Sequence, residues 1–194
     1  MTIQRFHPII PGASLPDDWY PGIIPKNIKV GENSVIDSSF CFKHFYATDP
    51  EACLIGNNVT IWRTSLSVEE EGVLEIGDYS YLANASIACA AKITIGSYVF
   101  IAGGVTIIDS DFHPLDPASR LVDTIALSPV GNRKHRTCIK ARPVSIADDV
   151  WIGYNATILK GISIGSGVVI EPGSVVREDV PPNTHIAGNP AQPL

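Results

Sequence analysis

The chain has 194 residues, a formal net charge of −6, and 45% hydrophobic but only 18% charged residues. The acidic balance argues against a general nucleic-acid binder, which needs a concentrated positive face, and the hydrophobic content excludes a largely disordered chain. No apolar run approaches the roughly 20 residues that cross a bilayer, so we expect no membrane span. The length indicates one domain, and 16 glycines with 15 prolines favour tight turns over long helices.

Residues 1–28 are rich in proline and carry no repeat, so we predict that they form an N-terminal arm or cap. Nothing in Met1–Pro16 resembles a signal peptide, because Pro8, Pro11 and Pro16 interrupt any apolar helix. The four cysteines are widely spaced and form no C-x-x-C pair, which argues against a disulfide framework or a cysteine metal cage. They are Cys41, Cys53, Cys89 and Cys138. A reduced, cytoplasmic location is therefore expected.

Residues 29–194 are predicted to form one repetitive domain. Its second half carries an aliphatic residue every six positions, at Ile146, Ile152, Ile158, Ile164, Ile170 and Val176. A six-residue period walks around an α-helix instead of marking one stripe, so a helix does not explain the spacing. A short strand and a turn repeated every six residues do explain it, and this is the pattern of a hexapeptide β-solenoid. The aliphatic side chains then point inward and stack from coil to coil.

The same phase recurs upstream with interruptions, for example at Ile95, Ile101 and Ile107. Extra residues near Glu69 and a longer insert at 109–143 break the phase, and we expect both to be loops that project from the coil. The predicted fold class is therefore all-β, a parallel β-helix with a protruding loop.

Three stretches, Ser110–Asp116, Asp149–Gly153 and Pro172–Val176 continuing to Ala187–Ala191, resemble those of hexapeptide-repeat acyltransferases. The likeness is nearest to the galactoside and maltose O-acetyltransferase group. It implies a left-handed β-helix with three hexapeptides per coil. It also implies a homotrimer whose active sites lie between neighbouring subunits and use acetyl-CoA as co-substrate, with no metal.

His113 lies in the long break of the repeat and is followed by Pro114, which stiffens the loop. Carboxylates flank it at Asp109, Asp111 and Asp116. Acyl transfer to a hydroxyl needs a base that works near neutral pH, and histidine suits that task. The resemblance implies that His113 is this general base and that the acetyl group passes directly to the acceptor. The alternative is a surface histidine held by nearby carboxylates.

Asn84 lies in the coil that precedes the His113 loop. The resemblance implies that it contacts the acceptor or the thioester, and a side-chain amide can also stabilise an oxyanion. The alternative is a turn residue that tolerates the left-handed backbone conformation.

Trp151 follows an inward-pointing Val150, so its side chain should face outward, where a large aromatic is costly unless something covers it. The resemblance implies that Trp151 lines the cleft for the thioester arm, and packing between subunits is the alternative. Tyr154 and Pro172 stand at positions that touch CoA in the family. Their backbone atoms can make this contact with CoA whatever side chain the position carries.

The resemblance is weaker at the phosphate end of CoA. Arg177 and Glu178 stand where relatives commonly place Thr-Lys. A guanidinium binds phosphate well, so Arg177 is the candidate, although Glu178 opposes it. The basic residues between Arg133 and Arg142 form a second candidate for the CoA phosphate or an anionic acceptor, and a solvated loop is their alternative.

The sequence therefore predicts an acetyltransferase that moves an acetyl group from acetyl-CoA to a hydroxyl of a sugar or glycan precursor. An N-acyltransferase that acts on an amino sugar or nucleotide sugar is the nearest alternative. A γ-class carbonic anhydrase shares the solenoid but needs three histidine ligands around zinc, and the five histidines here lack the closely spaced pair of such enzymes. A non-catalytic scaffold would leave the His113 loop without a role.

Overall fold

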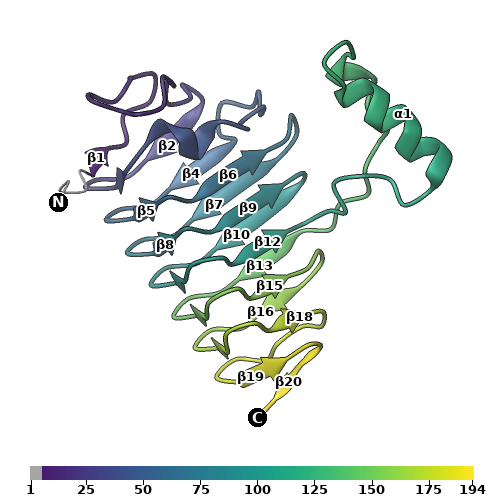
Figure 1. Cartoon of the computed structure of the whole chain (residues 1–194). Coiled ribbons are helices and arrows are strands. Elements are labelled where there is room, and N and C mark those ends of the chain that lie inside the picture. Colours follow the sequence, from purple (N-terminus) through teal and green to yellow (C-terminus); the bar gives the residue numbers. More distant parts are fainter. Residues whose placement is uncertain (1–5) are drawn as a thin grey trace.

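The computed structural model describes residues 6–194, which form a left-handed parallel β-helix (Figure 1). Each complete coil gives one short strand to each of three sheets, here called A, B and C, and the chain passes from B to A to C before rising one coil. The all-β solenoid predicted from the six-residue repeat is confirmed.

Sheets B and C contain only parallel strand pairs. Sheet B is formed by β2 (Ile28–Val30), β4 (Cys53–Ile55), β7 (Val73–Ile76), β10 (Lys92–Ile95), β13 (Val144–Ile146) and β16 (Ser163–Ile164). Sheet C is formed by β6 (Ser65–Val68), β9 (Ser86–Cys89), β12 (Thr106–Ile108), β15 (Thr157–Ile158) and β18 (Val175–Val176).

Sheet A is closed at each end by a strand that runs antiparallel to its neighbour. It is formed by β1 (His7–Pro8), β3 (Val35–Ile36), β5 (Thr60–Trp62), β8 (Tyr81–Ala83), β11 (Phe100–Ile101), β14 (Trp151–Ile152), β17 (Val169–Ile170), β19 (His185–Gly188) and β20 (Ala191–Pro193). The antiparallel end strands β1 and β20 occupy the open edges that parallel stacking leaves at the two ends of the sheet.

The core is a set of aliphatic columns that run along the axis of the helix. The predicted inward series from Ile146 to Val176 is between 0 and 2% exposed. Register explains the columns: in sheet A, for example, Ile101 pairs with Leu82 on one side and Ile152 on the other, and all three are fully buried. Strand alternation sends the neighbouring side chains outward, and Trp151 is accordingly half-buried.

The N-terminal residues pack on the first coil. β1 pairs with β3, and the 3₁₀ helix η1 (Ser39–Phe42) stands where the first coil would otherwise add a strand to sheet C. Residues 1–5 of the predicted arm or cap lie outside the described residues, and the division at residue 28 stays a prediction.

The insert at 109–143 differs from the predicted loop, because it contains helix α1 (Pro117–Leu127) and the 3₁₀ helix η2 (Arg133–His135). Asp116 caps α1 by accepting the backbone N–H of Ser119 at 2.8 Å, and Pro117 occupies the first turn, where its missing N–H costs nothing. An antiparallel bridge between Ser110 and Ala141 closes the base of the insert. Figure 1 shows α1 standing away from the coils.

Candidate active site

His113 follows β12 at the start of the insert, and its side chain is 56% exposed. Its Nδ1 atom lies 2.8 Å from Oδ2 of Asp123, which is fully buried on α1. An ionised carboxylate only accepts hydrogen bonds, so Nδ1 carries the proton in the neutral ring. Nε2 then keeps its lone pair, which is the state that a general base requires.

The carboxylate of Asp123 is held ionised by two partners. Arg136 Nε donates to its Oδ1 at 2.8 Å, and His113 occupies Oδ2. Burial alone would raise the pKa of Asp123, but the hydrogen bonds and charge of Arg136, with a smaller contribution from His113, outweigh it, and the pKa lies below its usual value. The ionised carboxylate of Asp123 therefore presents a fixed negative charge to the Nδ1 side of the His113 ring.

The three carboxylates that flank His113 in the sequence have other partners. Asp109 is fully buried and accepts the backbone N–H groups of residues 90–92 at 2.7 to 2.9 Å, so it stabilises the turn of the coil before it. Asp111 pairs with Lys160, and Asp116 caps α1. Proximity in sequence therefore identified the wrong partners for the histidine.

A second group of predicted residues lies along the corner where sheet A turns into sheet C. Asn84, which has a φ of +48°, occupies this turn after β8. Tyr154, 61% exposed, occupies the equivalent turn after β14, and the Gly173 N–H next to Pro172 donates to its carbonyl at 2.7 Å. Between them is Gly103, where an added Cβ would lie 3.3 Å from the Tyr154 ring and 3.8 Å from the Asn84 Cβ. Asn84, Tyr154 and Pro172 therefore form one continuous ridge.

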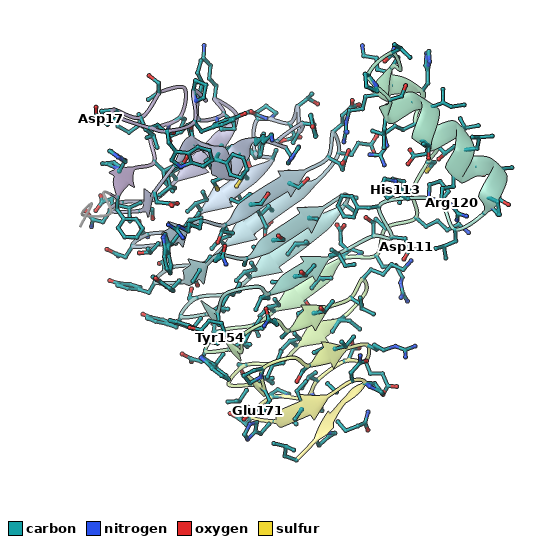
Figure 2. All side chains as sticks on the ribbon, viewed as in Figure 1. Asp17, Asp111, His113, Arg120, Tyr154 and Glu171 are labelled. Atoms are coloured by element: carbon teal, nitrogen blue, oxygen red, sulfur yellow. The ribbon has the colours of Figure 1, made fainter. Side chains whose placement is uncertain are left out.

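This ridge lies where the strands of sheet C begin, whereas His113 lies where they end. Asn84 precedes β9, whereas His113 follows β12, and these two strands pair in parallel. Figure 2 shows the separation: His113 lies with Asp111 and Arg120 beside α1, and Tyr154 projects from the other side of the coils. One chain therefore does not bring the predicted catalytic residues together.

The last two predicted residues are separated in the same way. Trp151 is half-buried on the outer face of sheet A, in register between Phe100 and Val169. Arg177 is exposed directly after β18, at the edge of sheet C from which the insert departs. Among the described residues, Arg177 has no hydrogen-bond or ion-pair partner, so its guanidinium is available to a ligand.

Much of the basic run in the insert is already paired. Arg133 donates to both carboxylate oxygens of Glu69 at 2.6 Å, and Arg136 is paired with Asp123. Arg133 fixes the insert to the coils and Arg136 is occupied by Asp123, so neither of these guanidinium groups is free for a phosphate, in contrast to that of Arg177.

The three buried cysteines do not provide a nucleophile at neutral pH. Burial raises the pKa of Cys53 to about 12 and that of Cys41 well above its usual value. Burial also raises the pKa of Cys89, which donates to the Val73 carbonyl. Cys138 is exposed in the insert. The buried thiols cannot form the thiolates that a covalent acyl-enzyme would need.

Sequence reasoning missed Asp123, which holds His113, and placed Arg136, which holds Asp123, only within a basic run. The available signal was the Asp116-Pro117 helix start, since it predicts a helix on which Asp123 lies away from the apolar positions Leu121 and Ile125. Within residues 6–194, no three His, Cys, Asp or Glu side chains are placed to hold a metal ion. The same residues include no helix that is both long and apolar enough to cross a bilayer.

A family model described as bacterial transferase hexapeptide (six repeats) matches residues 143–178, the stretch that forms the coils after the insert. Residues 143–178 are therefore similar to the repeats of that family. The resemblance predicted from the three sequence stretches is thereby confirmed.

Curated relatives include the putative acetyltransferase YJL218W of Saccharomyces cerevisiae, 35% identical over 153 residues that cover 78% of this chain and 63% of the relative. The putative lipopolysaccharide biosynthesis O-acetyl transferase WbbJ of Escherichia coli is 37% identical over 122 residues, which cover 61% of this chain and 55% of the relative. The matches thus span somewhat more than half the length of these relatives.

Solved structures of acetyltransferases are also similar to this chain. The hexapeptide-repeat acetyltransferase VCA0836 of Vibrio cholerae matches with a TM-score of 0.56 and 28% identity, covering 79% of this chain and 75% of that one. The same protein has also been solved with acetyl coenzyme A. A galactoside acetyltransferase in complex with coenzyme A matches with a TM-score of 0.51 and 32% identity, covering 62% and 54% of the two chains.

Proposed function

We propose that this protein transfers an acetyl group from acetyl-CoA to a hydroxyl of a sugar or glycan precursor. The observation that carries the proposal is the His113–Asp123 pair, in which the neutral form of an exposed ring carries its proton on Nδ1 and its lone pair on Nε2. The similarity to acetyltransferases that bind CoA supports the choice of donor. The similarity to WbbJ supports a glycan hydroxyl as acceptor.

In the proposed reaction, Nε2 of His113 takes the proton of the acceptor hydroxyl as its oxygen attacks the thioester carbonyl. The C–S bond then breaks, and the imidazolium returns the proton to the departing sulfur. Asp123 stabilises the imidazolium and fixes the ring, because its carboxylate is buried and ionised beside Nδ1. No cysteine takes part, in keeping with the raised thiol pKa values.

The ridge residues have complementary roles in this proposal. The Asn84 amide donates to the oxyanion that develops on the carbonyl. Trp151 packs along the thioester arm, and Tyr154 and Pro172 hold the arm through backbone atoms. Arg177 pairs with a CoA phosphate, for which an unpaired guanidinium is well suited.

A homotrimer completes the site, because His113 and Asn84 lie at opposite edges of sheet C in one chain. In the proposed assembly, the insert of one subunit reaches the ridge of the next. Helix α1 supports this arrangement: it buries Asp123 and Ala126 but exposes Leu121, Val122 and Ile125 by 61, 49 and 59%. A helix whose apolar face is outward needs a cover, and the neighbouring subunit supplies it.

A thiol-release assay with acetyl-CoA tests the proposal across a panel of sugars, nucleotide sugars and their amino-sugar counterparts. We expect turnover with hydroxyl acceptors and an ester product by mass spectrometry. Turnover restricted to amino sugars, with an amide product, would replace O-acetylation by N-acetylation. Absence of acceptor-dependent thiol release across the whole panel would contradict the proposed function.

A further inference from the structure

Arg136 lies at the centre of a charged cluster behind His113, on the side away from Nε2. Its side chain is 11% exposed. Nε donates to Asp123 Oδ1 at 2.8 Å, and Nη2 donates to the backbone carbonyl of Phe112 at 2.7 Å. Nη1 lies 3.5 Å from Glu69 Oε1. One guanidinium thus contacts the carboxylate that holds the histidine and the peptide that precedes it.

The contact with Phe112 stabilises an unfavourable backbone conformation. Phe112 has a φ of +58°, in the left-handed region that bulky residues rarely adopt. Such a conformation persists where surrounding contacts over-determine it. Three hydrogen bonds restrain this turn: the one from Arg136, that of the His113 N–H to the Asp111 carbonyl at 2.7 Å, and that of the Phe112 N–H to Ser110 Oγ at 3.3 Å. The direction in which His113 leaves the backbone therefore depends on Arg136.

The cluster also ties the insert to the body of the β-helix. Glu69 belongs to the turn between β6 and β7, far from the insert in sequence, and it accepts from Arg133 through both oxygens. The Arg133 guanidinium lies 3.9 Å from the centre of the Tyr46 ring. Arg133 therefore anchors the insert without touching either Asp123 or Phe112, whereas Arg136 touches both.

We propose that Arg136 is a positioning residue for the reaction, which sets the tautomer and orientation of His113 through Asp123 and the Phe112 carbonyl. The proposal rests on the proposed function, in which His113 is the base. A planar guanidinium places several N–H donors in a fixed fork. A lysine ammonium at the same position keeps the charge but loses the fork, so it cannot hold both acceptors in one geometry.

The test compares Arg136→Gln and Arg136→Lys with Arg133→Gln, which removes the same kind of side chain from the same Glu69 contact. The first readout is independent of activity: ¹⁵N NMR of the His113 ring. Wild type and Arg133→Gln should show the Nδ1–H tautomer with an unprotonated Nε2, and both Arg136 variants should show a mixture of tautomers.

Acetyl transfer is the second readout. We expect kcat to fall roughly 10–100-fold in both Arg136 variants, the loss usual for residues that orient a functional histidine, with the KM for acetyl-CoA unchanged. Arg133→Gln should change kcat by less than about threefold.

Wild-type tautomer and kcat in a folded Arg136→Lys or Arg136→Gln protein would overturn the inference. Equal losses of kcat in Arg133→Gln and Arg136→Gln would also overturn it, because anchoring alone would then explain the effect. Failure of the proposed function looks different: His113→Ala would keep its activity, while the tautomer result would still report on Arg136.

Discussion

Asp123 links the stability of the insert to pH, because it is fully buried and its pKa lies below the ordinary value. The ion pair therefore adds stability above the pKa of an unfolded aspartate, about 3.9, and this stability is lost as the pH falls through the lower folded value. Hydrogen-exchange protection factors for residues 109–143 should be high at neutral pH and drop below about pH 4.

The Asp123→Asn variant provides the matched comparison, since it keeps the size of the side chain and removes its charge. We expect its insert to be less protected by about 1–3 kcal/mol at neutral pH. The difference from wild type should shrink on acidification, when the wild-type carboxyl is protonated as well. A difference that stayed constant from pH 7 to pH 3 would show that the charge of Asp123 is not the source of the stability.

Arg177 should act on binding and not on chemistry. Arg177→Ala removes an exposed, unpaired guanidinium, so we expect a higher KM for acetyl-CoA with little change in kcat. The adjacent Glu178→Ala is the control, and removal of its negative charge should leave that KM equal or lower. An unchanged KM in Arg177→Ala would assign the phosphate contact elsewhere.

The aliphatic columns are the elements that should carry most of the stability of the coils. Ile158 is fully buried between Ile107 and Val176, whereas its neighbour Thr157 points outward. Ile158→Ala should lower the free energy of unfolding by about 2–5 kcal/mol, and Thr157→Ala should change it by about 0.5 kcal/mol or less. Urea unfolding followed by circular dichroism measures both, and equal effects of the two substitutions would contradict the inward stacking.

Helix α1 should determine the strength of subunit association. Ile125→Glu places a charge on the exposed apolar face, whereas Thr124→Glu places the same charge on the same helix outside that face. We expect Ile125→Glu to weaken association roughly 10–100-fold, from the burial energy of one aliphatic side chain. Analytical ultracentrifugation of the two variants measures the effect, and equal association constants would argue against α1 as part of the interface.

The contrast between the coils and the insert also explains what could be predicted from the sequence. The period of Ile146–Val176 fixes the β-helix, because each inward residue meets its own repeat one coil away and the pattern is local. The partner of His113 is not local in this sense. Asp123 lies beside it because α1 folds back toward the loop, and Arg136, further along the chain, holds the Asp123 carboxylate. Asp109 is close to His113 in the sequence but accepts hydrogen bonds from backbone N–H groups instead. The sequence near His113 therefore indicated that a carboxylate would hold the histidine, but it did not indicate which carboxylate.

At the scale of the whole molecule, we expect each active site to contain residues from two subunits. Sedimentation should show a trimer, and a stable, active monomer would contradict this. A mixing experiment tests the division of roles: His113→Ala and Asn84→Ala proteins, each with low activity, are unfolded together and refolded at equal ratio. About a quarter of the interfaces should then combine an intact His113 with an intact Asn84. No recovery of activity above the two separate proteins would place both residues in one subunit's site or remove Asn84 from it.

The measurement that most directly tests the proposed chemistry is acetyl transfer by His113→Ala. The His113 side chain is 56% exposed, and Arg136 can still pair with Asp123 when the imidazole is removed. The variant should therefore keep its assembly and melting temperature. We expect a kcat lower by roughly 10²–10⁴-fold, the usual contribution of a general base, with little change in the KM for acetyl-CoA. A folded His113→Ala protein that transfers acetyl groups at close to the wild-type rate would contradict the proposed chemistry.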